Sequence, residues 1–163
     1  LLEMADTGSM TVIERPYETT ASALCQKAIA ESNIASTETV GFTLQNEVPD
    51  TRLIKTSTAS VVKILNNLLQ NAVKFTNEGH ITLKVMLDEP KGQMMFAVID
   101  TGIGVPEEAR ERIFERFEKV DSFKEGIGLG LCVSRSLARR MGGDVTLADS
   151  SSQGSTFLLT IPL

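Results

Sequence analysis

The sequence has no tryptophan, one tyrosine and one histidine among its 163 residues, so aromatic platforms on which nucleic-acid bases could stack are few. Lysine and arginine number 16 against 21 aspartate and glutamate and form no basic block, which argues against a DNA- or RNA-binding surface. No apolar run approaches the roughly 20 residues that a membrane span requires. The remaining composition, 42% hydrophobic and 23% charged, is that of one globular domain with a core of its own.

Cysteine is scarce as well. Cys25 and Cys132 each lie in a helix-like apolar pattern, and neither has the spacing of a metal-binding motif. We expect both to be free thiols, which excludes a disulfide scaffold.

Residues 1–10 combine an apolar opening with a polar, glycine-containing stretch. This segment predicts the end of an upstream helix and a linker, and residues 11–163 are expected to form the domain.

Hydrophobic periodicity predicts the order of the helices and strands. Helical spacing occurs in residues 19–32, 58–75 and 128–141, with a capping residue at Ser57 or Thr58 and a short helix opened by Pro106. Alternating or short apolar runs predict strands at residues 11–15, 41–46, 52–55, 80–87, 94–100, 144–148 and 155–161. We therefore expect an α+β fold, a two-layer sandwich with a mixed, mostly antiparallel sheet and helices on one face.

The helix that ends at Phe75 has two contrasting faces. At about 100° per residue, one face is apolar: Val61, Leu65, Leu68, Leu69 and Ala72. The other face is polar: Lys63, Asn67, Gln70, Asn71 and Lys74. Asparagine is a poor helix former, yet this helix contains three within one and a half turns.

These amides have a structural and a functional interpretation. They could simply be hydrogen-bonding groups at a helix surface. Alternatively, Asn71 offers a neutral oxygen to a hard cation such as Mg²⁺, with Asn67 one turn away and Lys74 as a point charge for phosphate. Because one amide cannot hold Mg²⁺ alone, the ion would arrive with nucleotide phosphates as its other ligands.

An acidic residue and two alternating glycines follow a predicted strand. Asp100 could accept a hydrogen bond from an amino group such as that of adenine, while Gly102 and Gly104 would leave room for the ring. A plain tight turn is the competing interpretation.

A second glycine-rich segment leads directly into a helix: Gly126-Ile127-Gly128-Leu129-Gly130-Leu131. Free amide groups at a helix start can bind an anion such as phosphate. The segment lacks the lysine of a P-loop. It also lacks the preceding strand of a dinucleotide-binding fold.

Together with Phe114-Glu115-Arg116-Phe117 and Gly154-Ser155-Thr156-Phe157, these motifs occur in a characteristic order. Over residues 11–163 the chain resembles the ATP-binding catalytic domain of two-component sensor histidine kinases, of the wider group that includes DNA gyrase and heat-shock-chaperone ATPases. The resemblance implies the Bergerat type of α/β sandwich, with ATP and Mg²⁺ as cofactors.

The resemblance also implies roles for individual residues. Asn71 matches the Mg²⁺ ligand, with Asn67, Lys74 and Lys119 as catalytic or phosphate contacts. Phe75, Asp100 and Thr156 match residues around adenine, with Gly102 and Gly104 beside the carboxylate. The phosphate loop corresponds to Gly126, Gly128, Leu129 and Gly130, at the end of a short lid predicted at residues 120–127.

The implied reaction transfers the γ-phosphoryl group of ATP to a histidine on a separate dimerisation domain, which then serves a response-regulator receiver domain. His80 is expected to be a turn or strand-edge residue and not the phosphoacceptor. The resemblance implies a cytoplasmic domain, monomeric in isolation, within a parent that can be membrane-anchored, with no direct contact of this domain with the membrane.

Three positions depart from the family pattern: Lys63, Ser57 and Ser152. They motivate an alternative, a nucleotide-binding regulatory module without transfer activity. A serine kinase acting on an anti-sigma partner is a third hypothesis, although such proteins usually lack the upstream helix and the phenylalanine motif.

Overall fold

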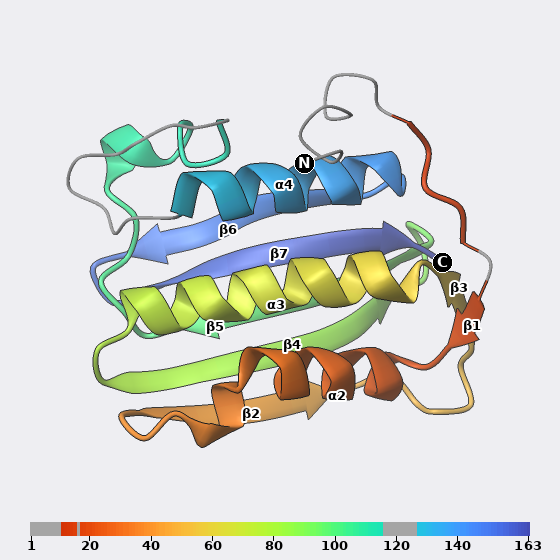
Figure 1. Ribbon diagram of the computed structural model, residues 1–163, viewed down its shortest axis with the longest axis horizontal. Coiled ribbons are helices and arrows are strands. Elements are labelled where there is room, and N and C mark those ends of the chain that lie inside the picture. The colour runs from red at the N-terminus through yellow and green to blue at the C-terminus, as the bar shows by residue number, and fades with distance from the viewer. Residues whose placement is uncertain (1–10, 16, 116–126) are drawn as a thin grey trace.

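The computed structural model describes residues 11–15, 17–115 and 127–163, and for residues 127–129 the backbone alone. Three α-helices lie on one face of a five-stranded sheet (Figure 1): α2 (Ala21–Ser32), α3 (Thr58–Phe75) and α4 (Ile127–Arg140). Two 3-10 turns accompany them: η1 (Ile34–Ser36) and η2 (Glu107–Ala109). The predicted α+β fold, a two-layer sandwich with helices on one face, is therefore confirmed.

The strands of the main sheet follow the spatial order β2 (Val40–Asn46), β4 (Gly79–Asp88), β5 (Gln93–Asp100), β7 (Gly154–Pro162) and β6 (Asp144–Ser151). Strands β2 and β4 are parallel, and every other neighbouring pair is antiparallel. A separate antiparallel pair joins β1 (Tyr17–Thr19) to β3 (Ile54–Thr56). The predicted hairpin of β4 and β5 is confirmed.

Helix α3 is the central helix of the covering layer. Its N-cap is Ser57, whose side chain accepts a hydrogen bond from the Ser60 amide, and the helix ends before the C-cap residue Thr76. The predicted apolar face is fully confirmed, since each of its five residues is at most 3% exposed: Val61, Leu65, Leu68, Leu69 and Ala72. Burying this face orients the opposite, amide-bearing side of α3 away from the sheet.

Three local predictions were wrong. Residues 11–15 form no strand; instead Ile13 N–H donates to the Arg140 carbonyl, and Arg140 Nε donates to the Thr11 carbonyl. The Arg140 carbonyl at the end of α4 has no partner within the helix, and the Ile13 amide pairs with it. The segment after Pro106 begins with a 3-10 turn and not an α-helix. Strands β6 and β7 extend beyond the predicted ranges 144–148 and 155–161, leaving only Ser152 and Gln153 between them.

Neither cysteine forms a disulfide, as predicted. Cys25 lies on the inner face of α2 with 0% exposure, and burial raises the pKa of its thiol to about 12. Cys132 is half-buried on α4. Within the described ranges, no helix is both long enough and apolar enough to cross a bilayer.

Candidate functional site

Asp100 ends strand β5 and is 3% exposed. Its Oδ1 accepts hydrogen bonds from the backbone amides of Gly102 at 2.9 Å and Ser155 at 3.2 Å. Its Oδ2 is buried and has no hydrogen-bond partner among the described residues. Burial raises the pKa of this carboxyl, and the two amide hydrogen bonds oppose that rise. One oxygen is thus fixed by the backbone, and the other can accept a hydrogen bond from a ligand amino group.

The two glycines after Asp100 allow close backbone contacts. A Cβ atom on Gly102 would collide with the Phe75 carbonyl at the end of α3. Gly104 has a φ of +78°, and a Cβ atom there would collide with the Ser151 carbonyl. The loop therefore packs tightly between α3 and the β6–β7 turn, and a larger residue at either position would push Asp100 out of place. That these glycines also leave room for an adenine ring stays a prediction.

Serine side chains tie this loop to the sheet. Ser155 Oγ lies 2.9 Å from Ser150 Oγ, which accepts a hydrogen bond of 2.8 Å from the Val105 amide. Ser155 is opposite Asp100 in the β5–β7 pairing and is 3% exposed. Thr156 is opposite Ile99, so strand alternation turns its side chain to the other face of the sheet. Ser155 is thus the side chain beside Asp100, and the predicted role of Thr156 at the adenine site stays a prediction.

The amide face of α3 contains a second buried, unpartnered group. Asn71 is 4% exposed, and its Nδ2 has no hydrogen-bond partner among the described residues. An amide can be turned so that either its nitrogen or its oxygen faces a given direction, so this side chain can present an oxygen to a cation. Asn67, one turn earlier, is half-buried and its Nδ2 donates to Ser134 Oγ of α4 at 3.1 Å. Lys74 is exposed at the end of the same helix.

Phe75 packs in the core with 1% exposure, and its carbonyl accepts a hydrogen bond from the Ile103 amide at 3.1 Å. This backbone hydrogen bond joins the end of α3 to the loop after Asp100. The predicted contact of the Phe75 ring with adenine stays a prediction.

The predicted phosphate segment is partly described. Helix α4 begins at Ile127, so Gly128, Leu129 and Gly130 belong to its first turn, where backbone amides have no partner within the helix. A Cβ atom on Gly130 would meet nothing within 4 Å, so the space beside this glycine is open among the described residues. Lys119, Gly126 and most of the predicted lid lie outside the described residues.

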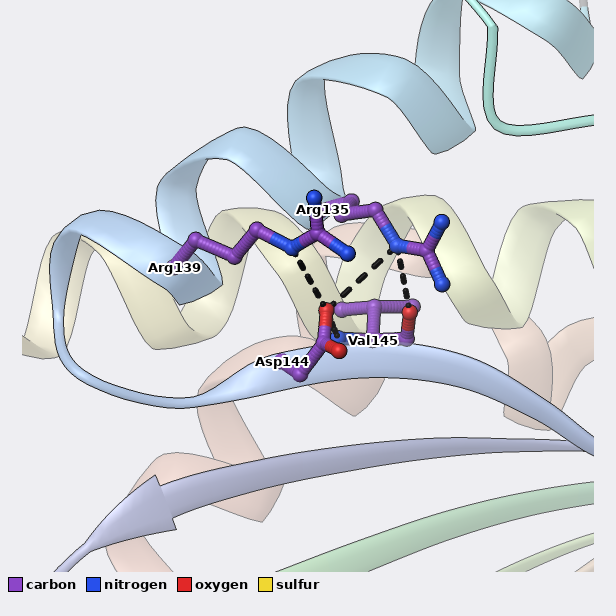
Figure 2. A network of polar contacts seen from close by, with 4 residues as sticks. All are labelled: Arg135, Arg139, Asp144 and Val145. Carbon is purple, nitrogen blue, oxygen red and sulfur yellow. Dashed lines mark hydrogen bonds and ion pairs between the residues drawn. The ribbon is translucent and has the colours of Figure 1, made fainter. Parts of the chain in front are cut away.

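The first phenylalanine of the Phe-Glu-Arg-Phe motif packs against α4. The Arg135 guanidinium lies 3.8 Å from the centroid of the Phe114 ring, and that ring meets the Phe157 ring edge to face at 6.3 Å. Figure 2 shows how Arg135 is held: its Nε donates to the Val145 carbonyl at 2.9 Å and lies 3.4 Å from Asp144. Burial lowers the pKa of Arg135, while Asp144 raises it.

Sequence reasoning missed three residues that organise this region: Ser134, Arg135 and Ser155. A signal existed for two of them. Ser134 lies four residues after Gly130, on the same helix face, and Ser155 shares a strand face with Phe157. The partners of Arg135 are distant in sequence, and no local pattern identifies them.

The donor set fits the predicted way of holding Mg²⁺. Among the described residues, no three histidine, cysteine, aspartate or glutamate side chains are grouped to bind a metal ion. That a cation at Asn71 takes nucleotide phosphates as its other ligands stays a prediction.

His80 is the second residue of β4 and is exposed. That it is not the phosphoacceptor stays a prediction. Its amide donates to Thr101 Oγ1 at 2.9 Å, and its Nε2 lies 2.7 Å from Thr43 Oγ1.

Comparison with known proteins identifies the family. Residues 56–163 match the model of the histidine kinase-, DNA gyrase B- and HSP90-like ATPases. The chain is 43% identical over 126 residues to the aerobic respiration control sensor protein ArcB of Escherichia coli K12, covering 74% of this chain and 16% of ArcB. It thus spans less than a fifth of that relative.

Solved structures agree with this result. Full-length ShkA in complex with AMPPNP superposes with a TM-score of 0.79 and 32% identity, covering 99% of this chain and 34% of that one. The catalytic domain of histidine kinase ThkA gives a TM-score of 0.75 over 90% of this chain and 95% of that one, and at 23% identity it supports the fold alone. The chain therefore belongs to the histidine kinase-, DNA gyrase B- and HSP90-like ATPase family, as an ATP-binding catalytic domain of the sensor histidine kinase type.

Proposed function

We propose that the protein containing this chain transfers the γ-phosphoryl group of Mg²⁺-bound ATP to a histidine on its own dimerisation domain, from which a response-regulator receiver domain takes it. One observation supports this proposal above all. Two buried polar atoms, Asp100 Oδ2 and Asn71 Nδ2, have no partner among the described residues. Leaving such groups unpaired costs about 1–3 kcal/mol each, so a ligand that pairs both is expected.

The roles of the residues follow from their chemistry. Asp100 Oδ2 accepts a hydrogen bond from the adenine amino group, while its Oδ1 stays bound to the Gly102 and Ser155 amides. At the other end, Asn71 and Asn67 present amides toward the metal-bound phosphates, and Lys74 adds a positive charge. The first-turn amides of α4 donate to phosphate oxygens. Bound Mg²⁺ neutralises charge on those oxygens.

The similarity to ShkA supports a nucleotide of this class, because that protein was determined in complex with AMPPNP. Two of the three departures from the family pattern, Ser57 and Lys63, lie away from the unpaired groups. Ser57 is the N-cap of α3, and Lys63 is exposed two turns, about 12 Å, before Asn71.

The test uses the parent protein with γ-labelled ATP and Mg²⁺. We expect an acid-labile phosphate on a histidine outside this chain, and Asn71→Ala should reduce labelling at least about tenfold. Gln70→Ala, at the exposed neighbouring position, is the matched control and should label normally. Nucleotide binding without any labelling of the parent would contradict the proposal and favour a regulatory module.

A further inference from the structure

Helices α3 and α4 pack side by side and run in opposite directions (Figure 1). A side-chain hydrogen bond crosses their interface, from Asn67 Nδ2 to Ser134 Oγ at 3.1 Å. Ser134 is 0% exposed, so its hydroxyl is shielded from water. Water therefore does not compete for this bond at the serine.

The position of this bond sets the register of the two helices. Because the helices are antiparallel, four residues onward along α3 leads to Asn71, and four residues back along α4 leads to Gly130. Both steps cover about 6 Å in the same direction and stay near the same helix face. Asn71 and Gly130 are therefore brought to corresponding positions on facing helices. Among the described residues, nothing lies within 4 Å of a Cβ atom added to Gly130, and Asn71 Nδ2 has no hydrogen-bond partner.

The bond also orients the Asn67 amide. Since the amide group is planar, holding Nδ2 at Ser134 determines where Oδ1 points. Asn66, the preceding residue, does not share this contact, and its Oδ1 is buried without a partner among the described residues. The neighbouring asparagines of α3 are thus not interchangeable.

We propose that Ser134 is a positioning residue for metal-bound nucleotide: its hydroxyl fixes the Asn67 amide and the register that places Asn71 across from Gly130. The inference rests on the proposed function and deepens it. Ser134 touches neither nucleotide nor metal in this role and acts through Asn67. The bond therefore contributes to the part of nucleotide affinity that depends on Mg²⁺, and adenine recognition at Asp100 is independent of it.

The test measures binding of a non-hydrolysable ATP analogue to this chain by calorimetry, with Mg²⁺ and with EDTA. The informative quantity is the Mg²⁺ enhancement, the Kd in EDTA divided by the Kd in Mg²⁺. Ser134→Ala should lower this enhancement about fivefold and leave the Kd in EDTA within about twofold of wild type, because a displaced contact weakens the metal-dependent part alone. Ser136→Ala is the matched control, since it removes from the same helix a buried hydroxyl that has no partner in the part of the chain that the structure describes, and it should keep the wild-type enhancement.

A second comparison separates positioning from general damage. In an Asn67→Ala background, Ser134→Ala should change the enhancement less than about twofold, because two residues that act through one contact are not additive. Thermal unfolding by circular dichroism checks each variant. Ser134→Cys keeps the side-chain size with a weaker acceptor and should show the same direction of change if the alanine variant does not fold.

Three outcomes would overturn the inference. The first is an unchanged enhancement in Ser134→Ala, and the second is a rise of both Kd values together, which a purely structural role predicts. The third is an equal loss in the wild-type and Asn67→Ala backgrounds. A wild-type enhancement near one would refute the proposed metal site as well, so that failure of the proposed function is recognised from the wild-type protein alone.

Discussion

The two ends of the proposed nucleotide site are built in contrasting ways. The adenine end, formed by Asp100, Gly102, Gly104 and Ser155, lies within the sheet and its connecting loops and is fixed by backbone amides. The phosphate end draws on two separate helices, and a side-chain hydrogen bond between Asn67 and Ser134 links them. The proposed function therefore makes base recognition depend on strand pairing and the phosphate contacts on how two helices pack.

Because of this contrast, we expect substitutions at the two ends to affect different properties of the domain. At the adenine end a carboxylate is kept buried before any ligand binds, and burial raises its pKa. At the phosphate end the described residues leave open space beside Gly130. Substitutions at the first end should thus affect stability together with base recognition, and substitutions at the second should affect metal-dependent affinity.

The largest effect is expected from Gly154→Ala. Gly154 has a φ of +136°, and an added Cβ would collide with the Asp100 carbonyl. The free energy of unfolding in urea should fall by about 3 kcal/mol or more, because both the backbone conformation and the strand contact oppose the side chain. Gly92→Ala is the control, at a φ of +64° with nothing within 4 Å, and should cost about 1 kcal/mol. Equal losses would contradict the tight packing at the adenine end.

Asp100→Asn should weaken ATP binding by about 1–3 kcal/mol, because an amide nitrogen in place of Oδ2 would face the adenine amino group with a second donor. Calorimetry with ATP and GTP measures the change, and the preference for ATP should diminish. Asp149→Asn, at an exposed position on β6, is the control and should bind ATP as the wild type does. An unaltered ATP affinity in Asp100→Asn would show that adenine is recognised elsewhere.

The same substitution gives a pH test of stability. Because the folded-state pKa of Asp100 is raised above 3.8, the folded chain binds more protons at this site than the unfolded chain between 3.8 and the raised value. The contribution of Asp100 to the free energy of unfolding is therefore greatest below pH 3.8 and is lost as pH rises through the folded-state pKa. The stability of wild type relative to Asp100→Asn should fall with rising pH across this window. A rise across it would contradict the sign of the shift.

A smaller effect is expected for the packing of Phe114 on α4. A double-mutant cycle of Phe114→Leu and Arg135→Met should give a coupling of about 0.5–1 kcal/mol in urea unfolding, as a partly exposed cation–π pair does. Additive losses would show that the 3.8 Å contact does not stabilise the fold.

The smallest effect should come from a position remote from both ends. Arg52 and Glu89 form an ion pair at 2.9 Å, with side chains 38% and 58% exposed. Glu89→Gln should change the free energy of unfolding by less than about 0.5 kcal/mol. This variant gives a baseline for the other stability measurements, and a larger loss would show that surface charge matters more than the comparison assumes.

Much of the fold could be predicted from sequence, because its signals are local. The apolar face of α3 is indicated by five residues at helical spacing, and the serine cap indicates where the helix begins. Residues 11–15 were assigned wrongly because their partner, the end of α4, is more than 120 positions away. Alternating apolar residues indicate burial on one side but not which element provides the partner.

The site divides along the same line. Asp100 and Asn71 could be proposed as site residues from sequence, because an acidic strand end and a helical amide are unusual in their local setting. Which of Thr156 and Ser155 lies beside Asp100 depends on the strand phase, which a one-residue shift inverts completely. The Asn67–Ser134 bond joins positions 67 residues apart, and no spacing within either helix reveals it.

The contrast between the two thiols has a practical consequence for anyone who wishes to watch this domain at work. With its pKa raised to about 12, Cys25 holds almost no thiolate at neutral pH and should resist alkylation. Cys132 is half-buried on α4, two residues from Gly130, and becomes the preferred target for a maleimide dye. The sequence thus offers a single labelling site on α4, the helix proposed to contact the phosphates. A fluorophore attached there could report nucleotide binding without any engineered cysteine.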